Sequence, residues 1–109
     1  MNVGITNLDP TPAFPFSRPN PWNVLRDPRA QIVLRSREQA VLPGTRILLH
    51  DLTGRIINVL GEGDLIDGRR IAEWNGLDQS GNVVPGGVYF YRVEEPGLPA
   101  RTGRIILLR

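Results

Sequence analysis

The sequence of 109 residues contains no cysteine. This absence excludes disulfide bonds, zinc–thiolate sites and thiol nucleophiles. Long apolar runs are absent too: none approaches the roughly eighteen residues of a membrane span, and Ile105–Leu108 has only the length of a strand. The remaining composition is mixed, with 40% hydrophobic and 22% charged residues. It is typical of a single globular domain.

Lysine is also absent, so all 13 basic residues are arginine, against 11 acidic residues. The arginines alternate with aspartate and glutamate and form no basic run, so we expect no nucleic-acid-binding patch. Arginine is favoured at protein interfaces because its guanidinium group makes bidentate contacts and stacks on neighbouring groups. Its exclusive use fits either an interface-rich surface or the codon bias of a GC-rich genome.

Residues that could carry catalysis are scarce. The one histidine, His50, has no cysteine to pair with, and the nearest carboxylate in the sequence, Asp51, lies in a predicted turn. Ser17, Ser36 and Ser80 are not surrounded by the glycine pattern of a nucleophile elbow. We therefore interpret His50 as a structural residue and predict that the chain is not an enzyme.

Acidic residues gather in two predicted loops, with Glu62, Asp64 and Asp67 in one and Asp78 in the other. Their spacing does not match the calcium loop of an EF-hand, and acidic residues are common in turns. We predict no metal site and no cofactor. Calcium binding by these loops is the alternative interpretation.

Residues 1–30 contain six of the ten prolines, which predicts an extended N-terminal arm. Proline lacks the amide donor that a sheet ladder needs and holds the preceding residue extended, so a helix or a central strand is not expected here. The aromatic residues of the arm can anchor it either on its own domain or on a neighbouring chain. The residues that we predict to contact a partner are Phe14, Phe16, Arg18 and Trp22.

From Gln31 onward, short runs of β-branched and aromatic residues alternate with glycine-containing turns, and no segment has a helical period. About seven antiparallel strands of this kind are best buried as two packed sheets, so we predict an all-β sandwich over residues 31–109. Deletion of residues 1–19 should then leave the sandwich folded. The predicted strands include Gln31–Leu34, Thr45–His50, Arg55–Leu60, Arg69–Trp74, Val88–Val93 and Arg101–Leu108.

These strands carry more aliphatic residues than a single buried face needs. A strand with one solvated face alternates apolar and polar residues, yet Leu48 stands between Ile47 and Leu49. Ile56 precedes a second isoleucine, and Ile71 precedes an alanine. Because several outward aliphatic side chains on one sheet face indicate a covered surface, we predict that Leu48, Ile56 and Ile71 also contact a protein partner.

Five short motifs follow one another from Asn20 to the end of the chain: Asn20–Asn23, His50–Arg55, Trp74–Gly81, Gly87–Arg92 and Arg104–Arg109. Their order and spacing resemble the immunoglobulin-like domain of flagellar hook-capping proteins and the related C-terminal sorting domains of type IX secretion cargo. His50 and Asn75 depart from the usual tyrosine and aspartate of the family. The resemblance implies an immunoglobulin-like β-sandwich, with Trp74 filling its core.

The resemblance also implies a location at the cell surface or in the periplasm, although Met1–Thr6 lacks the features of an export signal and we expect no signal peptide in the chain. We predict a non-enzymatic protein–protein interaction module, a subunit of a larger bacterial assembly that docks by its arm and sheet face. The alternative is a type IX secretion sorting or surface-attachment domain, and a carbohydrate-binding or hydrolytic module is a third. We expect protein partners, which can be membrane-associated, but no nucleic acid, no small-molecule substrate and no membrane span in the chain itself.

Overall fold

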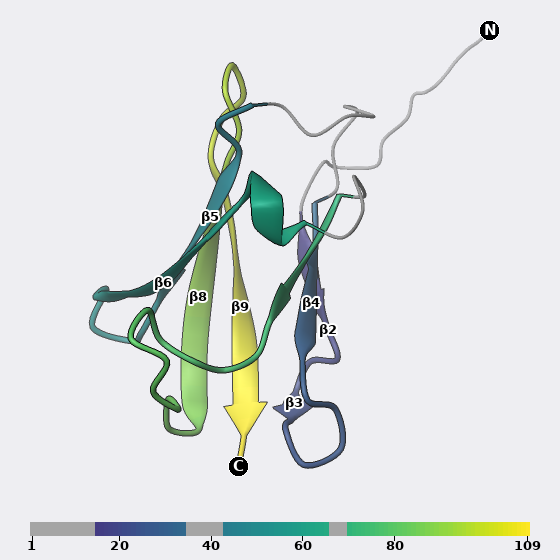
Figure 1. Cartoon of the computed structure of the whole chain (residues 1–109), viewed down its shortest axis with the longest axis vertical. Coiled ribbons are helices and arrows are strands. Elements are labelled where there is room, and N and C mark those ends of the chain that lie inside the picture. The colour runs from purple at the N-terminus through teal and green to yellow at the C-terminus, as the bar shows by residue number, and fades with distance from the viewer. Residues whose placement is uncertain (1–14, 35–42, 66–69) are drawn as a thin grey trace, which may run out of the picture.

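The computed structural model describes residues 15–34, 43–65 and 70–109. These residues form eight β-strands and one single-turn 3-10 helix, and the strands lie in two layers (Figure 1). This arrangement confirms the predicted all-β sandwich. The elements are β2 (Phe16–Arg18), β3 (Trp22–Asn23), β4 (Ala30–Val33), β5 (Arg46–His50), β6 (Ile56–Gly61), η1 (Glu62–Asp64), β7 (Ile71–Trp74), β8 (Gly87–Glu94) and β9 (Arg101–Leu108).

The three-stranded sheet has the order β2-β4-β7, and the five-stranded sheet has the order β3-β9-β8-β5-β6. The paired strands are antiparallel except β3 and β9, which run parallel. The six strands predicted after residue 30 are all present, each within two residues of its expected bounds. The sequence pattern therefore locates the main strands correctly.

Strand β8 shows how the alternating pattern becomes a packed layer. Tyr89, Tyr91 and Val93 are buried in the core, whereas Phe90 between the tyrosines is exposed. This follows because successive side chains of a strand point to opposite faces, and aromatic and β-branched residues favour the extended backbone. Burial raises the pKa of both tyrosines. Gly103 pairs with Tyr91, and a β-carbon there would collide with the tyrosine ring.

Two tryptophans and a tyrosine form the centre of the core. The ring centroids of Trp22 and Trp74 are 5.6 Å apart, and those of Trp74 and Tyr89 are 5.4 Å apart. Trp74 is only 1% exposed, which confirms its predicted burial. The indole N–H groups of Trp22 and Trp74 donate hydrogen bonds to the carbonyl oxygens of Asp27 and Leu77. The core therefore buries both rings without leaving their polar groups unpaired.

The N-terminal segment departs from the predicted arm. Strand β2 pairs with β4, β3 pairs with β9, and Ala30 is buried in the core. The described sandwich therefore includes residues 15–34 instead of beginning at Gln31. The prolines do not prevent this, because Pro15 and Pro19 flank β2, a short edge strand, and do not interrupt its paired residues.

Two turns share one construction, in which an aspartate organises the backbone that follows it. The Oδ1 atoms of Asp51 and Asp78 each accept hydrogen bonds from the N–H groups two and four residues ahead. Gly54 and Gly81 have φ angles of +89° and +84°, which glycine adopts readily. The hydroxyl of Thr53 also donates to Asp51, and this bond lowers the pKa of Asp51. Both aspartates thus have a structural role in the turns.

An ion-pair cluster connects the two layers near the turn between β8 and β9. The carboxylate of Glu95, in the turn after β8, has no exposed surface and pairs with Arg70 and Arg101. Arg70 directly precedes β7, and its Nε also donates to the carbonyl oxygen of Leu34. A buried carboxylate is tolerated only when it is paired and hydrogen-bonded. Glu95 therefore depends on both arginines.

Replacing Glu95 with glutamine should lower the free energy of unfolding by about 3–5 kcal/mol, because two buried guanidinium groups lose their counter-charge. Urea denaturation followed by circular dichroism measures the loss. Glu73→Gln is the matched control, since Glu73 pairs with Arg29 at the surface and such pairs contribute less than about 1 kcal/mol. Equal losses in the two variants would contradict a structural role for the cluster.

Deletion of residues 1–19 should destabilise the sandwich, contrary to the expectation from sequence, because it removes β2 from the edge of the three-stranded sheet. We expect the melting temperature to fall by roughly 10 °C, which corresponds to a loss of one to a few kcal/mol in a domain of this size. Deletion of residues 1–14, which leaves β2 in place, is the reference. An unchanged melting temperature after the longer deletion would show that β2 contributes nothing to the fold.

Candidate interaction surface

The described residues contain no cluster of side chains suited to a metal ion. Among residues 15–34, 43–65 and 70–109, no three histidine, aspartate or glutamate side chains lie close enough together to hold a metal ion. The Nδ1 atom of His50 lies 3.1 Å from the carbonyl oxygen of Gly54 in the adjacent turn. In the same part of the chain, no helix is long and apolar enough to cross a membrane. The outer faces and edges of the two sheets are the remaining candidate surfaces.

The outer face of the five-stranded sheet carries a line of apolar side chains. The strand register places Ile56, His50 and Phe90 in one row across β6, β5 and β8, so His50 lies between the two apolar side chains. In the next row Val88 lies opposite Ile106, and Leu108 follows on β9. Ile56, Phe90 and Leu108 are 45%, 40% and 46% exposed. We refer to Ile56, Val88, Phe90, Ile106 and Leu108 together as the apolar stripe.

Leu48 belongs to the same outer face but adds little to its surface. Its cross-strand neighbours are Val59 on β6 and Arg92 on β8. Side chains directly opposite one another in antiparallel strands lie close enough to cover each other. As a result Leu48 is only 8% exposed, although the strand directs it outward.

Charged side chains lie on the same face, beside the stripe. Glu94 accepts a hydrogen bond from the Nε atom of Arg46 at 2.7 Å and another from the Nε atom of Arg92 at 2.9 Å. These two bonds lower the pKa of Glu94, so its carboxylate is ionised at neutral pH. Arg104 is exposed on β9 and pairs across the strands with Phe90. The charged groups on this face are thus three arginines and one glutamate.

The outer face of the three-stranded sheet is smaller and more polar. Its first row consists of Phe16, Val33 and Ile71, which the register aligns across β2, β4 and β7. The second row consists of Arg18, Gln31 and Glu73. Phe16 is exposed, whereas Val33 and Ile71 are half-buried. This face therefore offers one apolar row and one hydrogen-bonding row.

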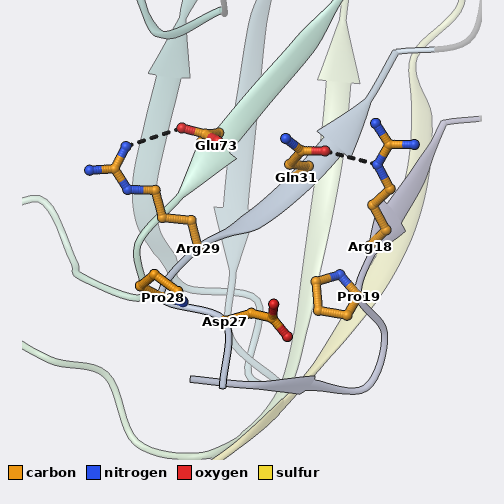
Figure 2. Close-up of a pocket in the computed structure, with 7 residues that line it drawn as sticks. All are labelled: Arg18, Pro19, Asp27, Pro28, Arg29, Gln31 and Glu73. Carbon is orange, nitrogen blue, oxygen red and sulfur yellow. Dashed lines mark hydrogen bonds and ion pairs between the residues drawn. The ribbon is translucent and has the colours of Figure 1, made fainter. Parts of the chain in front are cut away.

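An open groove of about 500 Å³ lies along the second row. The Nε atom of Arg18 donates to Gln31 at 2.8 Å, and Arg29 pairs with Glu73 at 3.1 Å. Figure 2 shows these two pairs side by side, above the loop that joins β3 to β4. Two arginines and two carboxylates balance in charge, so the groove has no strong preference for ligands of one sign. Its lining residues are Arg18, Pro19, Asp27, Pro28, Arg29, Gln31 and Glu73.

The edge of the five-stranded sheet at β6 is blocked by local hydrogen bonds. The backbone N–H of Val59 donates to the Oδ1 atom of Asn58, and that of Gly61 donates to the carboxylate of Asp64, both at 2.7 Å. The turn after β7 donates a further N–H to a carbonyl oxygen of β6. Groups with partners of their own are poor templates for an added strand.

The opposite edge, at β9, is covered by the N-terminal segment. The side-chain amide of Asn20 donates to the carbonyl oxygen of Arg104 and accepts from the N–H of Ile106, both at 3.0 Å. One asparagine side chain thus replaces the pair of backbone groups that a neighbouring strand would present. Strand β3 then continues the pairing further along β9. The two edges of this sheet are therefore occupied, and no described strand packs on its outer face.

The structure separates the seven predicted contact residues. Three lie on the outer face of the three-stranded sheet, namely Phe16, Arg18 and Ile71. Two lie on the outer face of the five-stranded sheet, namely Leu48 and Ile56. Trp22 has no exposed surface, so it belongs to the core and not to a partner surface. Phe14 lies outside the described residues.

Sequence reasoning missed most of the stripe. The strands that carry Val88, Phe90, Ile106 and Leu108 were predicted, but these four residues were not among the predicted contacts. The signal was present, because Phe90 alternates with the buried tyrosines of β8, and the even-numbered residues of β9 alternate with buried Ile105. Assigning every strand residue to a face would have found these positions.

Comparison with known proteins supports the fold. No family model matches the sequence, and no curated protein matches it. Among solved structures, the chain is similar to part of PorZ, which is described as an essential bacterial surface component of the type IX secretion system of Porphyromonas gingivalis. The two structures align with a TM-score of 0.64 and 23% sequence identity, and the alignment covers 87% of this chain. The chain spans 11% of the length of PorZ. At this identity the likeness shows a shared β-sandwich fold.

Replacing Asn20 with alanine should open the covered edge at β9, because the N–H of Ile106 then loses its acceptor. We expect the Ile106 amide to exchange with deuterium at least about tenfold faster, as local opening no longer has to break this bond. Exchange measured by NMR at single residues provides the test. Asn82→Ala, in an exposed turn, is the control and should leave Ile106 unchanged. Equal protection in both variants would mean that Asn20 does not close the edge.

Proposed function

We propose that the chain is a non-enzymatic protein-interaction module that docks into a larger assembly through the outer face of its five-stranded sheet. The observation that carries this proposal is the apolar stripe, in which three large apolar side chains are each at least 40% exposed. Single exposed aliphatic residues are common, but several gathered on one regular sheet face favour a surface that another protein covers. Aromatic and arginine side chains beside them are those enriched at protein interfaces.

The closed edges favour docking through the face. A partner that added a strand would need unpaired backbone groups along β6 or β9. The hydrogen bonds of Asn58, Asp64 and Asn20 already occupy groups at these two edges. The stripe, in contrast, lies on strands that are already paired, so its backbone needs no ordering before a partner makes contact.

The fold shared with PorZ supports an assembly at the bacterial surface as the setting. PorZ is described as a surface component of a secretion system, and the chain corresponds to a small part of it. We therefore propose an accessory subunit of a type IX secretion assembly as its role. A sorting or surface-attachment domain of secreted cargo is the second candidate, favoured by the motifs from Asn20 to Arg109.

The double variant Ile56→Ser/Phe90→Ser should lose the complex that the tagged chain forms in its own organism, because both changes remove apolar surface from the stripe. Loss of two such contacts typically weakens a complex by about a hundredfold or more. Native mass spectrometry of the purified complex measures the loss. Val83→Ser is the control, since Val83 is also an exposed apolar residue, at 64%, but it lies in an isolated bridge with Leu77 outside the stripe. Recovery of the same complex with the double variant would overturn the proposed function.

A further inference from the structure

The charges beside the apolar stripe are strongly biased toward one sign. On the outer positions of β5, β6, β8 and β9, the charged residues are Arg46, Arg92, Arg104 and Glu94. Three cations and one anion give this face a net charge of +2. The whole chain has nearly balanced charges, with 13 basic and 11 acidic residues. The net charge of this face therefore equals the net charge of the whole chain, which is +2.

Glu94 also fixes the orientation of the guanidinium groups of two of these arginines. Each of its carboxylate oxygens accepts a hydrogen bond from the Nε atom of a different arginine, Arg46 or Arg92. The side chains of these arginines are 55% and 48% exposed. Their terminal Nη groups have no hydrogen-bond partner among the described residues. Glu94 thus orients two guanidinium groups while leaving their outer donors available.

We propose that the partner covering the apolar stripe presents aspartate or glutamate side chains to Arg46, Arg92 and Arg104, next to apolar side chains of its own. The inference rests on the proposed function, because it names the chemistry of the partner that docks on the same face. A guanidinium group held in place binds a carboxylate through two parallel hydrogen bonds. The charge bias therefore selects an acidic surface and fixes its orientation on the stripe.

Other occupants fit this face less well. A second copy of the chain, docked by the same face, would bring two surfaces of net positive charge together, which is unfavourable. Nucleic acid would satisfy the arginines, but its phosphates offer nothing to Ile56, Phe90 and Leu108. An acidic protein surface with apolar residues would both pair with the arginines and cover the apolar stripe.

Two synthetic ten-residue peptides provide the test, one alternating valine with glutamate and the other alternating valine with lysine. Binding to the isotope-labelled chain is followed by NMR. We expect the valine–glutamate peptide to bind at least about tenfold more tightly, to shift amides of β5, β8 and β9, and to weaken as salt screens the charges. In the double variant Arg46→Ala/Arg92→Ala this affinity should fall about tenfold. Arg18→Ala/Arg29→Ala, which changes Arg18 on β2 and Arg29 directly before β4, is the matched control and should bind like the wild-type chain.

Equal affinity for the two peptides, no detectable binding of the valine–glutamate peptide, or unchanged binding by the Arg46/Arg92 double variant would each overturn the inference. Tighter binding of a DNA duplex than of the acidic peptide would overturn it in favour of nucleic acid, and concentration-dependent dimerisation lost in Phe90→Ser would overturn it in favour of a second copy. The proposed function fails separately, when the Ile56/Phe90 double variant retains the native complex. If that variant loses the complex but the arginine variants retain it, docking stands and only the charge preference is wrong.

Discussion

The structure depends on one chain segment, Phe16–Asn23, that belongs to both sheets. Its first part pairs with β4 in the three-stranded sheet, and its last part pairs with β9 in the five-stranded sheet. Between them Asn20 binds the backbone of β9, and Trp22 packs on Trp74 in the core. The Arg70–Glu95–Arg101 cluster connects the layers near the tip of the β8–β9 hairpin, at the opposite end from β3 (Figure 1). Two layers connected at both ends provide a rigid support for the side chains on their outer faces.

This construction separates the part of the molecule that holds the fold from the part that is open to partners. The residues that close the edges of the five-stranded sheet, such as Asn20 and Asp64, use their polar groups within the chain. The outer face has exposed apolar surface at Phe90, and among the described residues only the Nε atom of Arg92 donates a hydrogen bond, to Glu94. A partner can therefore be bound without breaking a hydrogen bond of the sandwich. This is the arrangement expected of a preorganised docking surface.

Local pattern was sufficient to predict the strands after residue 30 and the burial of Trp74, because alternation and β propensity act within a few residues. It was insufficient for the N-terminal segment. The proline content indicated an arm, but the contacts that make Asn20 and Trp22 structural involve β9, more than eighty residues away in the chain. The outward direction of Leu48, Ile56 and Ile71 was foreseeable. Their separation onto two faces was not, because it depends on which strands pair.

The structure also gives a physical reason for arginine at several positions, which composition alone left open between interface chemistry and codon bias. Glu95 is buried between two guanidinium groups, and Arg70 binds a backbone carbonyl as well. Arg109 donates from separate nitrogen atoms to the carbonyl oxygens of Val84 and Gly76. An ammonium group is a compact and more strongly hydrated charge, so burying it costs more, and it lacks the planar fork that reaches two acceptors. At these positions lysine is not an equivalent of arginine, and codon bias alone does not account for the choice. Arg46 and Arg92 use the same planar fork at the surface: one nitrogen of each binds Glu94, and the proposed partner would bind the others.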